Sequence, residues 1–134
     1  MSVFVDTSAL LAVLDHDEAH HAEAAAIWAD LLERDEDLVT TSYVLVETYA
    51  LAQRRLGLGA VRTLTQDFVP LLTVIWIDAA LHDAGLAAVF GANRRDLSLV
   101  DCVSFGAMRQ RHLDAVFAFD ADFGVQGFRL LSNS

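Results

Sequence analysis

Hydrophobic and polar positions along the chain follow two patterns. Short, continuous apolar runs are typical of buried strands, and apolar residues that recur every three or four positions are typical of helices with one buried face. The first pattern predicts strands at residues 2–5, 38–40, 73–77, 115–119 and 128–131. The second predicts helices at residues 8–14, 19–34, 42–56, 59–71, 79–92 and 99–111, with a loop at 93–96.

Strands therefore alternate with helices, and the strands are apolar at successive rather than at alternate positions. This combination predicts a parallel sheet covered on both faces, the α/β class. Ligands bind at the carboxyl ends of the strands in such sheets. The chain has 134 residues, one proline and no repeat or linker-like stretch, so we expect a single domain over residues 1–134.

The composition excludes several classes of protein. The longest apolar run, residues 68–77, contains Pro70 and is shorter than the roughly 20 residues of a membrane-spanning helix. The first residues lack the basic and apolar segments of a signal peptide. The single Cys102 cannot form an internal disulfide, and its apolar neighbours predict a buried, inert thiol. We expect a cytoplasmic protein with no membrane association.

The net charge of −10 argues against general attraction to nucleic acid. All nine basic residues are arginines, whose planar guanidinium suits two-point phosphate contact. Several lie close together in sequence, among them Arg54 with Arg55 and Arg62, Arg94 with Arg95, and Arg109 with Arg111. A compositional bias with ordinary solvated helix faces is the alternative explanation.

Two predicted strands are followed by aspartate. Asp6 follows the first strand and Asp120 follows the strand at 115–119, so both lie at the sheet edge where ligands bind. Aspartate is also a preferred helix N-cap and turn residue, which explains either residue taken alone.

Glu47 is harder to explain by a structural role. Its neighbours one helical turn away are all apolar or aromatic: Tyr43, Val44, Ala50 and Leu51. The carboxylate is therefore predicted to lie on the face meant for the core, and no arginine is within helical reach on that face. An unpaired buried carboxylate is costly, and a metal ion would compensate it.

Asp101 has two explanations of equal weight. Ser98 and Asp101 fit a capping box at the start of a helix, and Asp101 could equally belong to a catalytic set. Four carboxylates brought together repel one another unless a cation is present. A set of hard oxygen ligands suits Mg²⁺ or Mn²⁺, which can activate water for phosphodiester hydrolysis.

Four segments, in this order, resemble the motifs of PIN domains: VDTSAL, SYVLVET, LSLVDCVSF and FAFDADF. Their spacing and the chain length resemble the VapC group of bacterial toxin ribonucleases, over essentially the whole chain. The resemblance implies a three-layer α/β/α sandwich with a central parallel sheet. It also implies an Mg²⁺- or Mn²⁺-dependent endoribonuclease acting on structured RNA such as tRNA or rRNA.

The resemblance further implies roles for individual residues and partners. The carboxylates that hold the metal correspond to Asp6, Glu47, Asp101 and Asp120, and Asp122 matches a more variable acidic position. Members of the group pair into homodimers and are silenced by a cognate antitoxin protein. One position departs from the family pattern: Ala118 stands where Thr or Ser is frequent, so any hydrogen bond from that hydroxyl must be absent or come from elsewhere, with Thr7 and Ser8 as candidates.

Other interpretations remain open at the level of sequence. His16 and His20 are spaced like half of a zinc site, and His21 is adjacent, although a third ligand is missing. A catalytically inactive PIN-like module that acts through protein partners would explain the acidic charge and Ala118. A phosphoacceptor domain also clusters aspartates at strand ends, but it would need a lysine, which this chain lacks.

Overall fold

A computed structural model describes residues 1–132 and contains one sheet of five parallel strands. The strands lie in the order β3-β2-β1-β4-β5. Their bounds are β1 Ser2–Val5, β2 Asp37–Thr41, β3 Leu72–Ile75, β4 Ala115–Phe117 and β5 Arg129–Leu130. The order places β1 at the centre, where both of its faces are covered, and this explains its uninterrupted apolar sequence.

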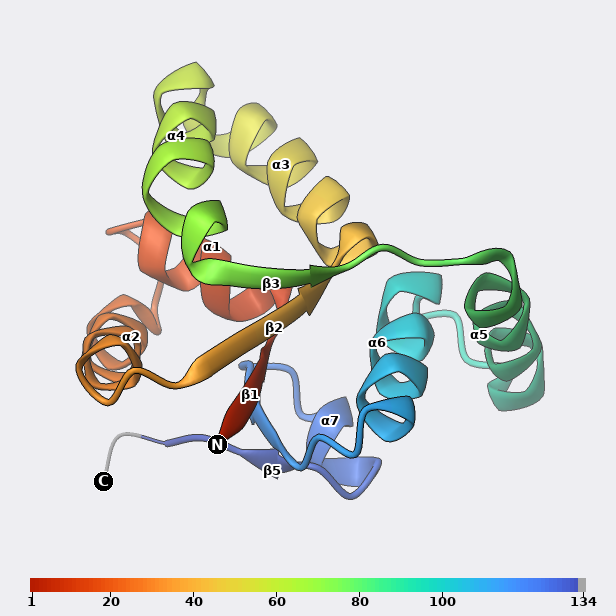
Figure 1. Ribbon diagram of the computed structural model, residues 1–134. Coiled ribbons are helices and arrows are strands. Elements are labelled where there is room, and N and C mark those ends of the chain that lie inside the picture. The colour runs from red at the N-terminus through yellow and green to blue at the C-terminus, as the bar shows by residue number, and fades with distance from the viewer. Residues whose placement is uncertain (133–134) are drawn as a thin grey trace.

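Helices cover both faces of the sheet, as Figure 1 shows. Their bounds are α1 Thr7–Leu14, α2 His21–Glu33, α3 Ser42–Leu56, α4 Leu58–Thr63, α5 Ala79–Ala92, α6 Leu99–Gln110 and α7 Asp122–Val125. α1 and α2 lie on one side, α5 and α6 lie on the other, and α3 packs against both α1 and α6. The predicted α/β/α sandwich is confirmed. Within residues 1–132, no helix has the length and apolarity needed to cross a membrane.

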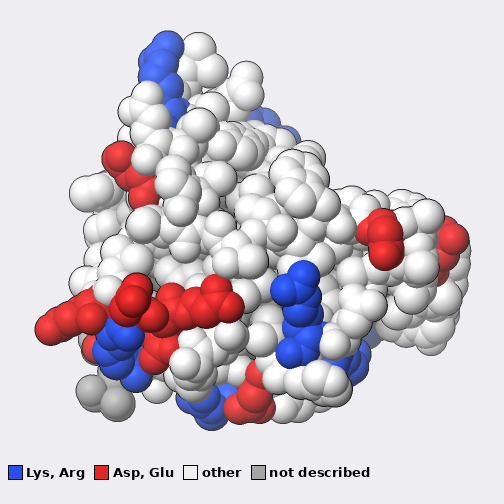
Figure 2. Space-filling view, viewed as in Figure 1, with Lys and Arg blue, Asp and Glu red and all other residues white. Residues whose placement is uncertain are grey.

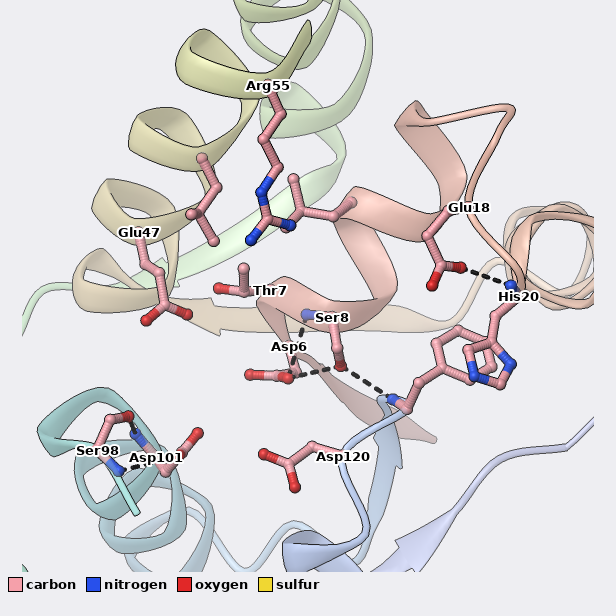
Figure 3. Close-up of a pocket in the computed structure, with 13 residues that line it drawn as sticks. Asp6, Thr7, Ser8, Glu18, His20, Glu47, Arg55, Ser98, Asp101 and Asp120 are labelled. Atoms are coloured by element: carbon pink, nitrogen blue, oxygen red, sulfur yellow. Dashed lines mark hydrogen bonds between the residues drawn. The ribbon is translucent and has the colours of Figure 1, made fainter. Parts of the chain in front are cut away.

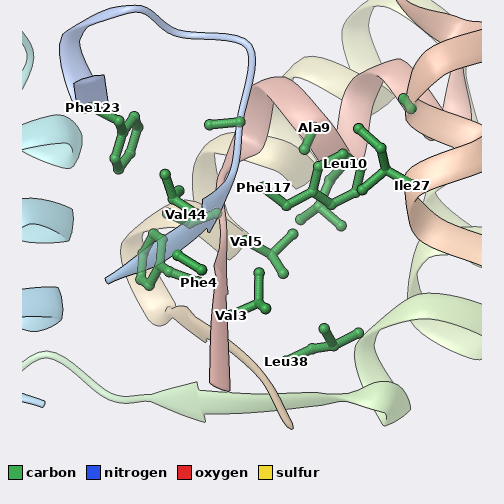
Figure 4. Packing of buried hydrophobic residues seen from close by; sticks show 14 of the residues in the cluster. Val3, Phe4, Val5, Ala9, Leu10, Ile27, Leu38, Val44, Phe117 and Phe123 are labelled. Atoms are coloured by element: carbon green, nitrogen blue, oxygen red, sulfur yellow. The ribbon is translucent and has the colours of Figure 1, made fainter. Parts of the chain in front are cut away.

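The core has aromatic side chains packed on both sides of the sheet, and Figure 4 shows Phe4 and Phe123 on one side and Phe117 on the other. Phe4 of β1 packs 6.3 Å from Phe123 of α7, whose ring is 5.0 Å from Phe105 of α6. Phe117 of β4 points to the opposite side, 6.5 Å from Trp28 of α2. Successive strand side chains alternate between the faces, so the same strands hold both layers of helices through different residues.

Three segments differ from the pattern-based predictions. The helix predicted at 59–71 is divided: α4 is followed by a wide turn at Leu64–Phe68 and a tight turn at Val69–Leu71. Pro70 lacks an N–H and cannot extend a regular helix there. β4 ends at Phe117, two residues earlier than predicted, because the N–H of Phe119 bonds to a side chain instead of a strand. α7 was not predicted, since four residues carry no readable helical period.

Charged side chains are unevenly distributed over the surface. Acidic side chains gather where α2 passes into β2, on the lower left of Figure 2, and Arg34 in this region pairs with Asp30 at 2.7 Å. One group of basic side chains lies at the top of the view, near α4, whose last turn carries Arg62, and other basic side chains lie at the lower centre. Arginines on the helical corner between α3 and α4 are therefore spatially separate from this acidic region.

Candidate active site

The four predicted acids line one open pocket with a volume of about 530 Å³. Asp6, Glu47, Asp101 and Asp120 come from four separate segments: the end of β1, the middle of α3, the first turn of α6 and the loop after β4. Their carboxylates face a common space in Figure 3. Asp120 lies three residues beyond the end of β4, so it reaches the pocket from a loop and not from the strand itself.

Asp6 is the most buried of these acids, with 4% of its surface exposed. It caps the N-terminus of α1, and its Oδ2 accepts hydrogen bonds from the backbone N–H of Ser8 at 3.2 Å and from the Ser8 hydroxyl at 2.7 Å. Burial raises the pKa of Asp6 to about 6; the bonds from Ser8 oppose this shift, and the charge of Asp101 adds to it. Asp6 therefore caps α1 and lines the pocket at the same time.

Ser8 also connects Asp6 to the segment that carries Asp120. The backbone N–H of Phe119 donates to the Ser8 hydroxyl at 2.9 Å, and that hydroxyl donates to Asp6. Ala118, beside this junction, has no hydroxyl to offer, and Ser8 supplies one from α1. Ser8 is thus one of the two residues named from the sequence as a candidate source of a hydroxyl at this position.

Two buried threonines fix the distance between α1 and α3. The Thr48 hydroxyl lies 2.7 Å from the carbonyl oxygen of Val44 and 3.1 Å from the hydroxyl of Thr7. Thr7 follows Asp6 and Thr48 follows Glu47, so this contact joins the backbones next to two of the acids. Both threonines are at most 4% exposed, and their hydroxyls are satisfied within the protein.

Glu47 does not face the core, and that prediction was wrong. It is half-buried at the pocket edge, while Val46 is 68% exposed and Ala50 is exposed. Of its four apolar neighbours only Val44 belongs to the core; Tyr43 and Ala50 line a surface groove, and Leu51 lines the acidic pocket. Arg55 lines the same pocket from two turns further along α3, although the helical spacing predicts no arginine within reach of Glu47. Helical side chains lean toward the N-terminus, which brings this long side chain back over the pocket.

Asp101 serves as a helix cap and lines the pocket at the same time. Its Oδ2 accepts from the backbone N–H of Ser98 at 3.1 Å, and its own N–H donates to the Ser98 hydroxyl at 3.1 Å. Burial is the main cause that raises the pKa of Asp101, and the charges of Asp120 and Glu47 raise it further. The two explanations that the sequence left open are therefore compatible.

The structure does not bring Asp122 into the pocket lining. Its carboxylate pairs with Arg94 at 3.1 Å, and its backbone N–H donates to Oδ1 of Asp120 at 2.9 Å. Asp122 thus contacts one pocket acid through the main chain, while its own charge is directed to a surface arginine.

The histidine cluster is divided between different partners. His20 lines the pocket and stacks on Phe119 with ring centres 4.5 Å apart, whereas His16 stacks on His21 at 4.4 Å. α2 begins only at His21, so His16 and His20 do not share a helical face. The half zinc site suggested by their spacing is absent. His20, Glu18, Ser98 and Arg55 complete the polar lining, and only the tertiary structure reveals the pocket positions of Glu18 and His20.

A family model for the PIN domain matches residues 3–128, which is most of the chain. The chain belongs to the PIN-domain family. Its sequence is 32% identical over 129 residues to the 23S rRNA-specific endonuclease VapC20 of Mycobacterium tuberculosis, covering 94% of this chain and 95% of the relative. The identification from four short motifs is confirmed.

Solved structures support the same assignment for this PIN-domain protein. The crystal structure of Mycobacterium tuberculosis VapC20, described as a Sarcin-Ricin loop cleaving toxin, superposes with a TM-score of 0.86 at 29% identity, covering 98% of this chain and 99% of that one. VapBC2 from Rickettsia felis bound to a promoter DNA fragment has a TM-score of 0.71 at 12% identity, over 99% of this chain and 100% of that chain. The second likeness establishes the fold alone.

The chemistry of the PIN-domain pocket fits a hard divalent cation. Its acidic side chains offer carboxylate oxygens, with the hydroxyls of Thr7 and Ser8 beside them. Within residues 1–132, Asp6 forms no salt bridge, so its buried carboxylate has no cationic partner from the chain there. Among residues 1–132, no group of three or more Asp, Glu, His or Cys side chains already has the arrangement of a metal site. Cys102 is buried and its pKa is raised by burial, as expected of an inert thiol.

Proposed function

We propose that this protein is a divalent-metal-dependent endoribonuclease in which Asp6, Glu47, Asp101 and Asp120 hold Mg²⁺ or Mn²⁺. The observation that carries the proposal is the meeting of four carboxylates from four chain segments in one open pocket. Burial raises the pKa values of Asp6 and Asp101, so a cation that favours their ionised forms would be strongly bound.

A bound Mg²⁺ or Mn²⁺ ion would activate water and neutralise charge on the phosphate under attack. The protein's own contribution is to hold the carboxylates in place. Ser8 orients Asp6 and joins it to Phe119, and the Thr7–Thr48 contact sets the position of α3 beside α1. Asp122 acts through its N–H on Asp120. Orientation of this kind by neighbouring groups commonly accounts for about 10- to 100-fold in metal affinity or activity.

We infer that the substrate is structured RNA, with ribosomal RNA as the first candidate and tRNA as the second. The basis is similarity over nearly the whole chain to VapC20, which is named a 23S rRNA-specific endonuclease. The same similarity supports a role as the toxin of a toxin–antitoxin pair, silenced by a cognate antitoxin, as in the VapBC assemblies that share the fold. Such a substrate would be met in the cytoplasm.

A homodimer is supported by an apolar groove between α3, α5 and α6. Its lining includes Tyr43, Val46, Leu99 and Val100, with Val46 largely exposed, and Glu47 lies where the groove meets the acidic pocket. A second copy that covered this groove would bury apolar surface at roughly 25 cal/mol per Å². Val46→Glu is expected to convert the dimer to a monomer in sedimentation experiments. A monomeric parent protein would contradict the dimer.

The direct test of the proposed activity is cleavage by purified protein. We expect ribosomes or total RNA to be cut in Mg²⁺ or Mn²⁺, the cuts to be absent in EDTA, and the sites to be located by sequencing RNA ends. Asp120→Asn should abolish cleavage, whereas Asp114→Asn, which removes an exposed carboxylate paired with Arg129, should not. If Asp120→Asn cuts as well as the parent, the acids are structural and the inactive binding module becomes the better description.

A further inference from the structure

Arg55 is the one Lys or Arg side chain among the residues that line the acidic pocket. It comes from the last turn of α3, and in Figure 3 its guanidinium reaches over the pocket toward Thr7, on the side away from Asp101 and Asp120. The pocket thus has Asp101 and Asp120 at one end and a single permanent cation at the other, with Glu47 and Glu18 at its sides.

Arg55 has no hydrogen-bond or salt-bridge partner among residues 1–132. Among residues 1–132, four arginines form salt bridges or charge-assisted bonds at the surface: Arg34, Arg94, Arg109 and Arg129. Arg55 forms neither, although it shares a pocket with five carboxylates, those of the four acids and of Glu18. A guanidinium beside so many acids and paired with none of them is available for an anion that enters the pocket.

The anion that this arrangement suits is a nucleic-acid phosphate. The guanidinium presents two parallel N–H donors that match two phosphate oxygens, and it stays charged at any physiological pH. A chain of net charge −10 cannot hold RNA by general electrostatic attraction. A cation placed at the point of cleavage therefore contributes a larger fraction of the binding free energy.

We propose that Arg55 binds a phosphate of the RNA substrate. This phosphate is next to the one that is cleaved beside the acids, so the contact fixes the position of the RNA strand in the pocket. This proposal rests on the proposed endoribonuclease function. A residue in this role stabilises bound substrate and transition state equally, so its loss raises KM and leaves kcat nearly unchanged. A residue that only neutralised the acids would instead change the Mg²⁺ concentration needed for half-maximal activity.

Arg54 provides a matched control, because Arg54→Gln removes the same charge from the same helical turn, and Arg54 does not line the pocket. Steady-state cleavage of an RNA stem-loop would be measured for the parent, Arg55→Gln, Arg55→Lys and Arg54→Gln over a range of salt and of Mg²⁺. For Arg55→Gln we expect kcat/KM to fall about tenfold through KM, with the log–log salt slope reduced by about 0.7 to 0.9. Arg55→Lys should recover part of the loss, and Arg54→Gln should match the parent.

Three outcomes would overturn the proposal. Equal losses of activity in the Arg54 and Arg55 variants would mean that only the overall charge of the protein matters. An unchanged KM in Arg55→Gln would mean that Arg55 does not contact RNA. A change confined to the Mg²⁺ concentration needed for activity would mean that Arg55 acts on the acids. Thermal unfolding of both glutamine variants identifies any loss that comes from destabilising the end of α3. A parent protein that cuts no RNA would instead remove the proposed function on which this inference rests.

Discussion

The Ser8 hydroxyl lies 2.7 Å from Oδ2 of Asp6, and it links this buried acid to the neighbouring loop after β4. The same hydroxyl accepts from the backbone N–H of Phe119, whose neighbour in sequence is Asp120. One side chain from α1 therefore orients one acid and anchors the loop that carries another. The arrangement leads to a specific expectation for Ser8.

Ser8→Ala should lower cleavage about 10-fold, because Asp6 loses the shorter of its two hydrogen bonds and keeps only the one from the backbone N–H of residue 8. It should also lower the free energy of unfolding by about 1 to 3 kcal/mol, because the Phe119 N–H is left without its acceptor. Ser104→Ala is the control, since it removes a buried hydroxyl that donates to Val100 at 2.8 Å and does not line the pocket. Full activity in Ser8→Ala would show that this hydroxyl is dispensable.

Asp6→Asn should stabilise the metal-free protein at pH 8. The pKa of Asp6 is about 6 in the folded protein against 3.8 for an unperturbed aspartate, so the folded state binds this proton more tightly than the unfolded chain does. Its contribution to stability is fully present below pH 3.8 and is lost as the pH rises through about 6. The loss amounts to about 3 kcal/mol, which a neutral side chain avoids.

Urea unfolding in EDTA at pH 4 and pH 8 measures this effect. The gain from Asp6→Asn should be present at pH 8 and largely absent at pH 4. Added Mg²⁺ should raise the melting temperature of the parent more than that of Asp6→Asn, because binding to the folded state stabilises it. A variant that is less stable than the parent at pH 8 would mean that the Ser8 bonds outweigh the cost of burial.

The two roles of Asp101 can be separated by mutation. Asp101→Asn keeps an oxygen that can accept from Ser98 and so preserves the cap, but it removes the charge. We expect cleavage to be lost with little change in unfolding free energy. Ser98→Ala should lower stability by about 1 kcal/mol, the usual value of an N-cap, and should retain more activity than Asp101→Asn. The reverse ranking of activities would mean that Asp101 is chiefly structural.

Asp122 is expected to matter less than Asp120. Asp122→Asn keeps the backbone N–H that bonds to Asp120 and breaks the partly exposed pair with Arg94, which contributes under about 1 kcal/mol. Cleavage and Mg²⁺ affinity should therefore change little, whereas Asp120→Asn should abolish both. Titration calorimetry with Mg²⁺ distinguishes them, and equal losses in the two variants would make Asp122 a direct ligand.

Apolar patterning was enough to predict the α/β class, the order of the long elements and the positions of Asp6 and Asp120 after strands. These features depend on local periodicity, which each segment carries by itself. The errors have different origins. β4 ends early because the Phe119 N–H bonds to Ser8, a contact that local periodicity does not contain, and the four residues of α7 carry no helical period. Pro70 divides the helix before β3, and the apolar neighbours of Glu47 gave a misleading local signal for a core position.

The sequence by itself determined which carboxylates are available and, through the order of four motifs, the family. Only the tertiary structure decided which of them meet. Asp101 reaches the pocket because a capping box fixes the start of α6. The Asp122 carboxylate pairs with Arg94 outside the pocket lining. Arg55 lines the pocket although it lies two helical turns beyond Glu47. The physical reason is that a side chain's neighbours in space are set by how helices pack on the sheet, and sequence spacing does not specify that packing beyond one helical turn.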